Sequence, residues 1–95
     1  MQTTLTQHVE FRPKRSGHER PFIRGTRVEV LSIVTDSEVH GMSAEEIARG
    51  YDNVSLADVY AALTFYHDNR DLLRQMLRED EEWVEQQRRS EASGL

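Results

Sequence analysis

The sequence predicts a mainly α-helical α+β domain, in which an N-terminal β-hairpin precedes a helix-turn-helix as in winged-helix proteins. Two short β-type segments flank a polar loop within the first 28 residues, and two serine-capped helices follow at residues 43 and 55. A third observation concerns assembly. Only 37% of the 95 residues are hydrophobic and 31% are charged, which leaves a thin core. We therefore expect a homodimer that shares part of its core.

The N-terminal segments have the pattern of a hairpin. Residues His8–Phe11 alternate polar and apolar side chains, as in a half-buried strand. Residues Pro21–Val28 form a second extended segment, with its proline at the start, where no ladder N–H is lost. Gly25 inside that segment predicts a β-bulge or a close backbone approach. The polar loop Pro13–Arg20 is the predicted hairpin tip. Because two strands alone are marginally stable, they need helices or a second copy to pack against.

Helical periodicity begins near Val30, and Gly41 is well placed to follow the last turn of that first helix. Ser43–Glu46 has the spacing of a capping box, which predicts the start of a second helix. Ser55 is the expected N-cap of a third helix, with Asp58 in its first turn, where a carboxylate favours the helix dipole.

The last two of these helices form a helix-turn-helix pattern. We expect them over Ala44–Tyr51 and Leu56–Phe65. In such proteins the second helix presents its N-terminal residues to the major groove. Here that helix offers Ser55 and Tyr60 to bases but no basic side chain, and Asp58 would repel phosphates. Serine-capped helical hairpins also occur in other folds, so a purely structural role remains an alternative.

The C-terminal third predicts an amphipathic helix. Residues Leu72–Val84 place apolar side chains at helical spacing among many Glu and Arg residues. The sequence leaves open whether His67–Asn69 breaks the helix before it. From Gln86 onward there is little to bury, so we expect fraying. The hairpin and helix-turn-helix domain is therefore assigned to residues 1–78, and the acidic helix end with its frayed tail to residues 79–95.

Charge is distributed unevenly along the chain. The first 30 residues contain six basic and three acidic residues, whereas the remainder contains six and fourteen. This asymmetry predicts two surfaces with different partners. If DNA binds, its phosphates would be contacted mainly by the basic N-terminal segment, with steep salt dependence and modest sequence selectivity. The candidate cations are Arg12, Lys14, Arg15, Arg20, Arg24 and Arg27. Each could instead form an ion pair with the acidic helices.

The acidic C-terminal helix is a candidate partner-binding arm. Its segment Asp68–Arg89 contains seven acidic residues and a single tryptophan. An amphipathic helix can dock in a groove of another protein, where an aromatic anchor contributes much of the binding energy. The candidate contact residues are Leu73, Met76, Leu77, Glu79, Asp80, Trp83 and Val84. The alternative is that the apolar members close the domain's own core or a dimer interface.

No catalytic constellation is present in the sequence, and we expect no enzyme activity and no cofactor. The absence of cysteine excludes disulfides and thiolate chemistry. The histidines lack the spacing of a zinc site. A dimer could still bring copies of His18 and His67 together to ligate haem or another transition metal, which is the alternative function.

The chain is expected to be cytoplasmic. Residues Met1–His8 lack the basic and apolar regions of a signal peptide. No apolar stretch approaches the roughly 20 residues that span a bilayer, so no membrane partner is expected.

Three sequence runs together resemble the bacterial domain-of-unknown-function family 433. They are Arg20–Val28, which contains Gly-Thr-Arg after a proline and an isoleucine, then Gly41–Ile47 and Val54–Leu63. The last two have the family's patterns G-x-S-x-E-E-I and D-V-x-A-A-L. Order and spacing agree over about Arg20 to Tyr66, although the family's usual glycine-rich turn before the proline is replaced here.

The resemblance implies a compact winged-helix-like dimer that acts as the antitoxin of a toxin–antitoxin pair. The toxin of such a pair is often a PIN-type ribonuclease. Antitoxins of this kind bind the toxin and frequently their own promoter. The expected partners are therefore a cognate toxin, a second copy of the chain and operator DNA.

Overall fold

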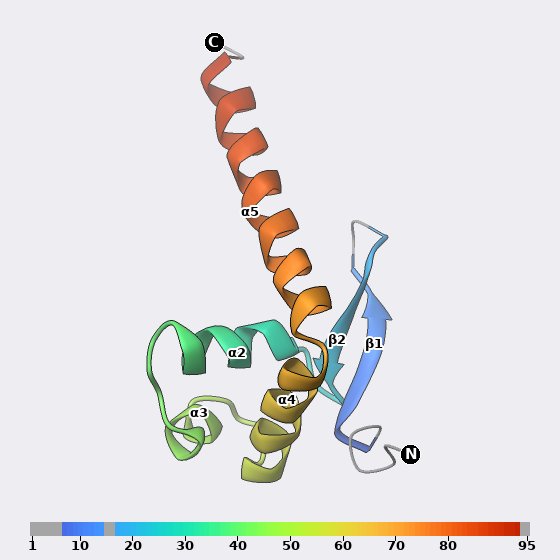
Figure 1. The fold of residues 1–95 in the computed structure, drawn as a ribbon, viewed down its shortest axis with the longest axis vertical. Helices are drawn as coiled ribbons and strands as arrows, with labels where there is room; N and C mark the ends of the chain where they lie inside the picture. Colours follow the sequence, from blue (N-terminus) through green and yellow to red (C-terminus); the bar gives the residue numbers. More distant parts are fainter. Residues whose placement is uncertain (1–6, 15–16, 94–95) are drawn as a thin grey trace.

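The computed structural model describes residues 7–14 and 17–93, and it confirms a mostly helical chain with an N-terminal antiparallel hairpin. Helices α2, α3 and α4 pack around one another, the hairpin lies against them, and α5 projects away from this body (Figure 1). The elements are β1 (Val9–Pro13), β2 (Glu19–Ile23), α2 (Val30–Glu38), α3 (Ala44–Arg49), α4 (Leu56–Asp68) and α5 (Arg70–Ser93). None of the described helices is both long enough and apolar enough to cross a membrane.

The hairpin pairs Val9 with Ile23 at its base and Pro13 with Glu19 near its tip. Val9 and Ile23 are buried in the common core. On the same face, Phe11 packs edge-on against Phe65 of α4, with ring centroids 5.9 Å apart. The strands therefore bury one face against the helices, as two isolated strands must do to be stable.

The predicted extent of the second strand is wrong, because β2 starts at Glu19 and ends at Ile23 rather than spanning Pro21–Val28. A tight turn follows, in which Gly25 has a φ of +77°, a conformation that glycine adopts without strain. The Thr26 hydroxyl donates to the Ile23 carbonyl (2.8 Å) and accepts from the Val28 N–H (3.0 Å). Gly25 thus reverses the chain after the strand and does not form a bulge within it.

The three central helices begin where the sequence predicts. Ser43 and Glu46 form a reciprocal capping box at the start of α3, with hydrogen bonds of 3.1 and 2.8 Å. Ser55 and Asp58 form a second at the start of α4, with both bonds at 3.0 Å. Each box satisfies amide groups that a helix N-terminus would leave unpaired. The helix-turn-helix is present, although α3 ends at Arg49 and α4 continues to Asp68.

Residues from every element of the body form one core. Its fully buried side chains are Ile23, Val30, Ile33, Ile47, Val59, Ala62 and Leu73. At its edge, the Tyr51 hydroxyl donates to Asp36 of α2 at 2.8 Å. Burial and this hydrogen bond raise the pKa of Tyr51 to about 12. The turn between α3 and α4 is therefore tied to α2.

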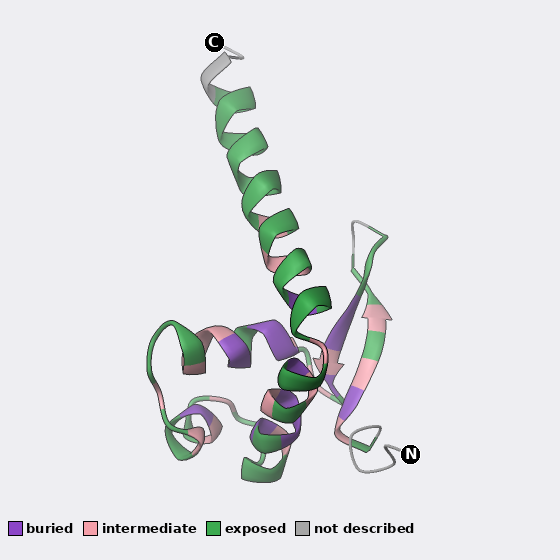
Figure 2. Cartoon of the chain, viewed as in Figure 1, coloured by how far each residue is buried: buried purple, intermediate pink, exposed green. Residues whose placement is uncertain are grey.

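The helix is interrupted at Asn69, between α4 and α5. The sequence had left open whether His67–Asn69 would break it. Asn69 ends α4 with φ −135° and ψ 40°, and its side-chain amide donates to the Phe65 carbonyl at 2.9 Å. Helix α5 then buries Leu73 and becomes exposed as it leaves the body (Figure 2). The fraying expected from Gln86 stays a prediction, and α5 is helical as far as Ser93. That segment is rich in good helix formers, and Glu85 pairs with Arg88 and Arg89 one turn away.

Candidate partner-binding site

Arg20, a predicted phosphate contact, is buried and already paired. Its residue is only 8% exposed, and its two terminal nitrogens donate to the Asp80 carboxylate at 2.9 and 2.8 Å. The Nη2 atom of Arg20 also lies 3.2 Å from a carboxylate oxygen of Glu29. The hydrogen bond with Asp80 raises the pKa of Arg20 despite its burial. Arg20 is therefore not part of an exposed basic surface and instead joins the hairpin to α5.

Arg12 and Arg24 also have local partners. Both contact Glu10 on β1, at 3.3 and 3.1 Å respectively. Arg12 also donates to the Thr26 carbonyl and lies over the Phe22 ring, 4.2 Å from its centroid. Much of the positive charge that the sequence shows in this region is therefore compensated within the hairpin and its following turn.

The three remaining candidate phosphate contacts are Lys14, Arg27 and Arg15, and each has a different environment. Lys14, at the hairpin tip, pairs with Glu29 at 3.1 Å. Arg27 is exposed and forms no ion pair with any residue that the structure describes. Arg15 lies outside the described residues. Arg27 is thus the cation in this segment with the clearest access to a phosphate.

The start of α4 offers little to a DNA groove. The Ser55 hydroxyl is used in the capping box, while Tyr60 is half exposed on the helix surface. His8 contacts Asp58 at 2.6 Å. Burial opposes ionisation of Asp58, but hydrogen bonds from the Ser55 backbone, His8 and the Ser55 hydroxyl together lower its pKa. A carboxylate therefore stands at the position where a recognition helix would approach phosphates.

Of the predicted partner-binding residues of α5, Asp80 pairs with Arg20 and Glu79 accepts a hydrogen bond from Gln75. The five apolar residues fall into two groups. Leu73 is fully buried, and Met76 and Leu77 pack partly against the core. For Leu73 the alternative role in the core is the one that the structure shows. Trp83 is 60% exposed and Val84 48% exposed. Only the second pair presents a substantially open apolar surface to a partner.

A groove of about 750 Å³ lies between the hairpin tip and α5. Three apolar side chains of α5 line one side, namely Met76, Trp83 and Val84. Lys14, His18 and Glu19 line it from the hairpin, and Arg20, Glu79 and Asp80 complete it. The hairpin's share of this surface was not predicted, because about 60 residues separate it from α5 and no local pattern links the two.

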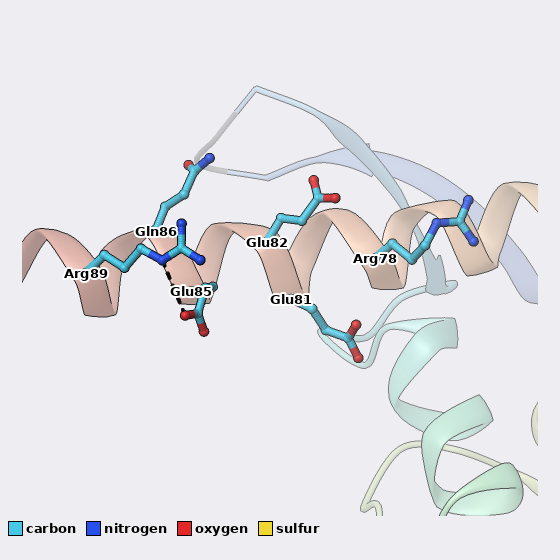
Figure 3. A pocket seen from close by; sticks show the side chains of 6 residues that line it. All are labelled: Arg78, Glu81, Glu82, Glu85, Gln86 and Arg89. Carbon is cyan, nitrogen blue, oxygen red and sulfur yellow. Dashed lines mark ion pairs between the residues drawn. The ribbon is translucent and has the colours of Figure 1, made fainter.

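A second depression of about 380 Å³ lies on α5 alone (Figure 3). Its lining residues all come from this helix, and all are exposed: Arg78, Glu81, Glu82, Glu85, Gln86 and Arg89. Glu85 and Arg89 pair across one turn at 3.5 Å. Because no second element forms a wall, this depression is a solvated helix surface.

The two histidines considered as haem ligands lie apart. His18 lines the groove at the hairpin tip, whereas His67 lines a different depression, where α4 meets α5. Within the described part of the chain, no group of three or more His, Asp or Glu side chains is arranged to hold a metal ion. Ligation by histidines from two copies of the chain stays a prediction.

Comparison with known proteins gives one match. The family model described as protein of unknown function DUF433 matches residues 14–66, which is more than half of the chain. No curated protein and no solved structure matches the chain. The matched segment runs from the hairpin tip into α4 and leaves α5 beyond it. The chain therefore belongs to the DUF433 family, with α5 as an extension beyond the matched region.

Proposed function

We propose that the chain is a cytoplasmic, antitoxin-like regulator that neutralises a PIN-type ribonuclease toxin by binding it through the second half of α5. The observation that carries this proposal is the exposure of Trp83 and Val84 within the acidic run Glu79–Glu85. A large aromatic side chain surrounded by charges on a projecting helix is typical of an interaction site.

Charge supports the same reading. Five of the seven residues in Glu79–Glu85 are acidic. A ribonuclease must hold a polyanion and therefore presents basic side chains around its active site. An acidic helix would be attracted to that surface, which raises the association rate, while the apolar contact of Trp83 would slow dissociation.

The test is co-expression with the product of a neighbouring PIN-type reading frame. We expect a stable complex whose ribonuclease activity is suppressed. The double variant Trp83→Ala, Val84→Ala should fold but lose both binding and suppression. A matched control is Glu45→Ala, an exposed acidic residue on α3. The proposal is wrong if no complex forms, or if the double variant neutralises the toxin as well as the wild type does.

We propose DNA binding as a second function, centred on Arg27 rather than on the hairpin tip. Arg27 lines a hollow of about 650 Å³ whose other polar side chains include Arg12, Asp52 and Asn53, just before the start of α4. The exposed guanidinium of Arg27 and the Asn53 amide are donors suited to a phosphate, whereas Arg12 already pairs with Glu10. A promoter-fragment shift assay at about 50 mM salt tests this proposal, because low salt favours phosphate contacts. Arg27→Gln should weaken the shift, and absence of any shift would contradict the proposal.

A further inference from the structure

We infer that the groove between the hairpin tip and α5 receives one anchor segment of the partner protein, a large apolar side chain flanked by lysine or arginine. This inference rests on the proposed function for the identity of the partner, and it adds the chemistry that the partner must present. It also assigns half of the binding site to the hairpin tip.

The apolar part of the groove fits such a side chain. Met76, Trp83 and Val84 lie on one side of a hollow of about 750 Å³, a volume within the usual range for binding pockets. Trp83 and Val84 are both about half exposed or more, so an inserted side chain would remove them from water. Burial of that apolar area is the main source of binding energy.

The charges around the groove favour a cationic flank. Its two strong cations are already neutralised, since Lys14 pairs with Glu29, and Arg20 pairs with Glu29 and Asp80. The carboxylates of Glu19 and Glu79 form no ion pair among the described residues. Glu79 accepts a hydrogen bond from the Gln75 amide at 3.2 Å. A basic segment would give both carboxylates an ion-pair partner, whereas an acidic peptide or a nucleic acid would be repelled.

The two walls are held together before any partner arrives. The bidentate hydrogen bond between Arg20 and Asp80 fixes the hairpin to α5 directly beside the groove. A bidentate guanidinium–carboxylate pair constrains direction as well as distance. The partner therefore meets a preformed groove and does not have to order it, which lowers the entropic cost of binding.

A second copy of the chain is a poorer occupant. In a two-fold symmetric contact, the same patch meets itself. The acidic run Glu79–Glu85 would then face an identical run, and close contacts between like charges are destabilising. Complementary charge therefore points to a basic partner and not to self-association at this surface.

Trp83 is the chain's only tryptophan, so its fluorescence reports directly on the groove. The full chain would be titrated with three synthetic peptides. The first has a central Leu-Phe pair flanked by Arg and Lys, the second has the same centre flanked by Glu, and the third has the basic flanks around Ala-Ala. We expect a saturable blue shift with the first peptide only, because it alone supplies both the anchor and the cations.

Variants separate the groove from the general acidity of α5. Glu19→Gln and Glu79→Gln should each weaken binding of the first peptide by about two- to fivefold, the scale of a solvent-accessible ion pair. Glu91→Gln is the matched control, because Glu91 is also exposed on α5 but lies outside the groove. Trp83→Ala should weaken binding of the first peptide by about thirtyfold or more, as at an interface hot spot. Because this variant has no tryptophan fluorescence, its affinity is measured by calorimetry.

Several results would overturn the inference. One is the absence of a blue shift with the first peptide, and another is equal binding of the acid-flanked peptide. A third is an equal loss of affinity in Glu19→Gln and Glu91→Gln, which would reduce the effect to net charge. Sedimentation of the free protein gives a fourth. If Trp83→Ala converts a dimer to a monomer, the groove belongs to a second copy.

Failure of the inference can be distinguished from failure of the proposed function. If the ribonuclease does not bind but the basic apolar peptide does, the groove stands and the toxin assignment falls. If the ribonuclease binds Glu19→Gln and Glu79→Gln as tightly as it binds the wild type, the toxin assignment stands and the groove falls.

Discussion

The body of the molecule buries most of its apolar residues and exposes a few large ones, such as Val39 and Tyr60, whereas both large apolar residues of α5 beyond Leu77 are exposed. In the body, Ile33, Ile47 and Val59 are fully buried among three helices and a hairpin. On α5, Trp83 is 60% and Val84 48% exposed, and the second half of this helix is exposed along its length (Figure 2). Both segments are helical, so secondary structure does not distinguish them. The difference supports the proposal that the exposed part of α5 beyond Leu77 contacts a partner protein.

The two regions also differ in how many of their acidic residues form ion pairs. In the hairpin, Glu10 and Glu29 lie within 3.3 Å of neighbouring cations. On α5, only Asp80 and Glu85 of the run Glu79–Glu85 form ion pairs within the described chain. Glu10 and Glu29 are thus neutralised within the body, whereas Glu79, Glu81 and Glu82 form no ion pair with any residue that the structure describes.

The largest effect should come from the core. Ile33→Ala should lower the free energy of unfolding by about 3 kcal/mol, because it removes buried methyl groups and leaves a cavity. Urea denaturation followed by circular dichroism measures it. Ile33→Val keeps most of the volume and should cost about 1 kcal/mol, which gives a folded variant if the alanine variant does not fold. If neither variant lowered the free energy of unfolding, the core around Ile33 would not be what stabilises the fold.

The link between the two regions should give the next effect. Arg20→Met should cost about 2 kcal/mol, less than for a fully enclosed pair, because the carboxylates of Glu29 and Asp80 keep some access to water. Thermal unfolding monitors the loss. Arg24→Met, at an exposed pair with Glu10, is the control and should change stability by less than about 0.5 kcal/mol. Equal effects of the two variants would show that Arg20 does not join hairpin and helix.

Acid should weaken the same link. The hydrogen bond from Arg20 lowers the pKa of Asp80 against the effect of burial. Because the folded-state pKa is below the ordinary carboxyl value, this stabilisation is present above that value and is lost as the pH falls through the lowered one. After allowance for solvent screening, we expect about 1 kcal/mol. Stability measured from pH 6 to pH 2.5 should fall less steeply in Asp80→Asn, and parallel curves would contradict the assignment.

The smallest effect on stability should come from the exposed apolar pair. Val84→Ala and Trp83→Ala should each change the free energy of unfolding by less than about 0.5 kcal/mol, the usual range for surface positions. The same urea titrations used for Ile33 measure them. A cost above about 1 kcal/mol for either would mean that these side chains stabilise the fold, and the contrast between body and helix would fail.

Local sequence patterns predicted most of the fold. Both capping boxes, the helix starts at Val30, Ala44 and Leu56, and the hairpin ahead of them follow from spacings within a few residues. The end of β2 did not follow, because the turn at Gly25 depends on the Thr26 hydroxyl, whose partners a pattern of hydropathy does not show. The extent of α5 to Ser93 did not follow either, because the residues from Gln86 onward have helix propensity but no apolar periodicity.

The candidate site was less accessible to sequence reasoning. The acidic run and Trp83 could be recognised on one helix, but the opposite wall comes from residues about 60 positions earlier. The burial of Arg20 is likewise a long-range property, since it depends on Asp80 and Glu29 converging on one guanidinium. The charge distribution along the chain predicted Arg20 as a DNA contact. In the structure Arg20 is buried, because it pairs with Glu29 and Asp80.

Because the helix is interrupted at Asn69, a small change of direction there would displace the far end of α5 by a larger distance. At 1.5 Å per residue, the 24 residues of this helix extend about 36 Å from that point. A rotation of about 10° at Asn69 would therefore carry the far end about 6 Å. Asp80 lies about 15 Å along the helix, where two hydrogen bonds from Arg20 attach it to the hairpin. Any displacement at that attachment is more than doubled at the tip, so the Arg20–Asp80 pair, together with the packing of Leu73, Met76 and Leu77 on the core, limits how far the exposed end of α5 can move.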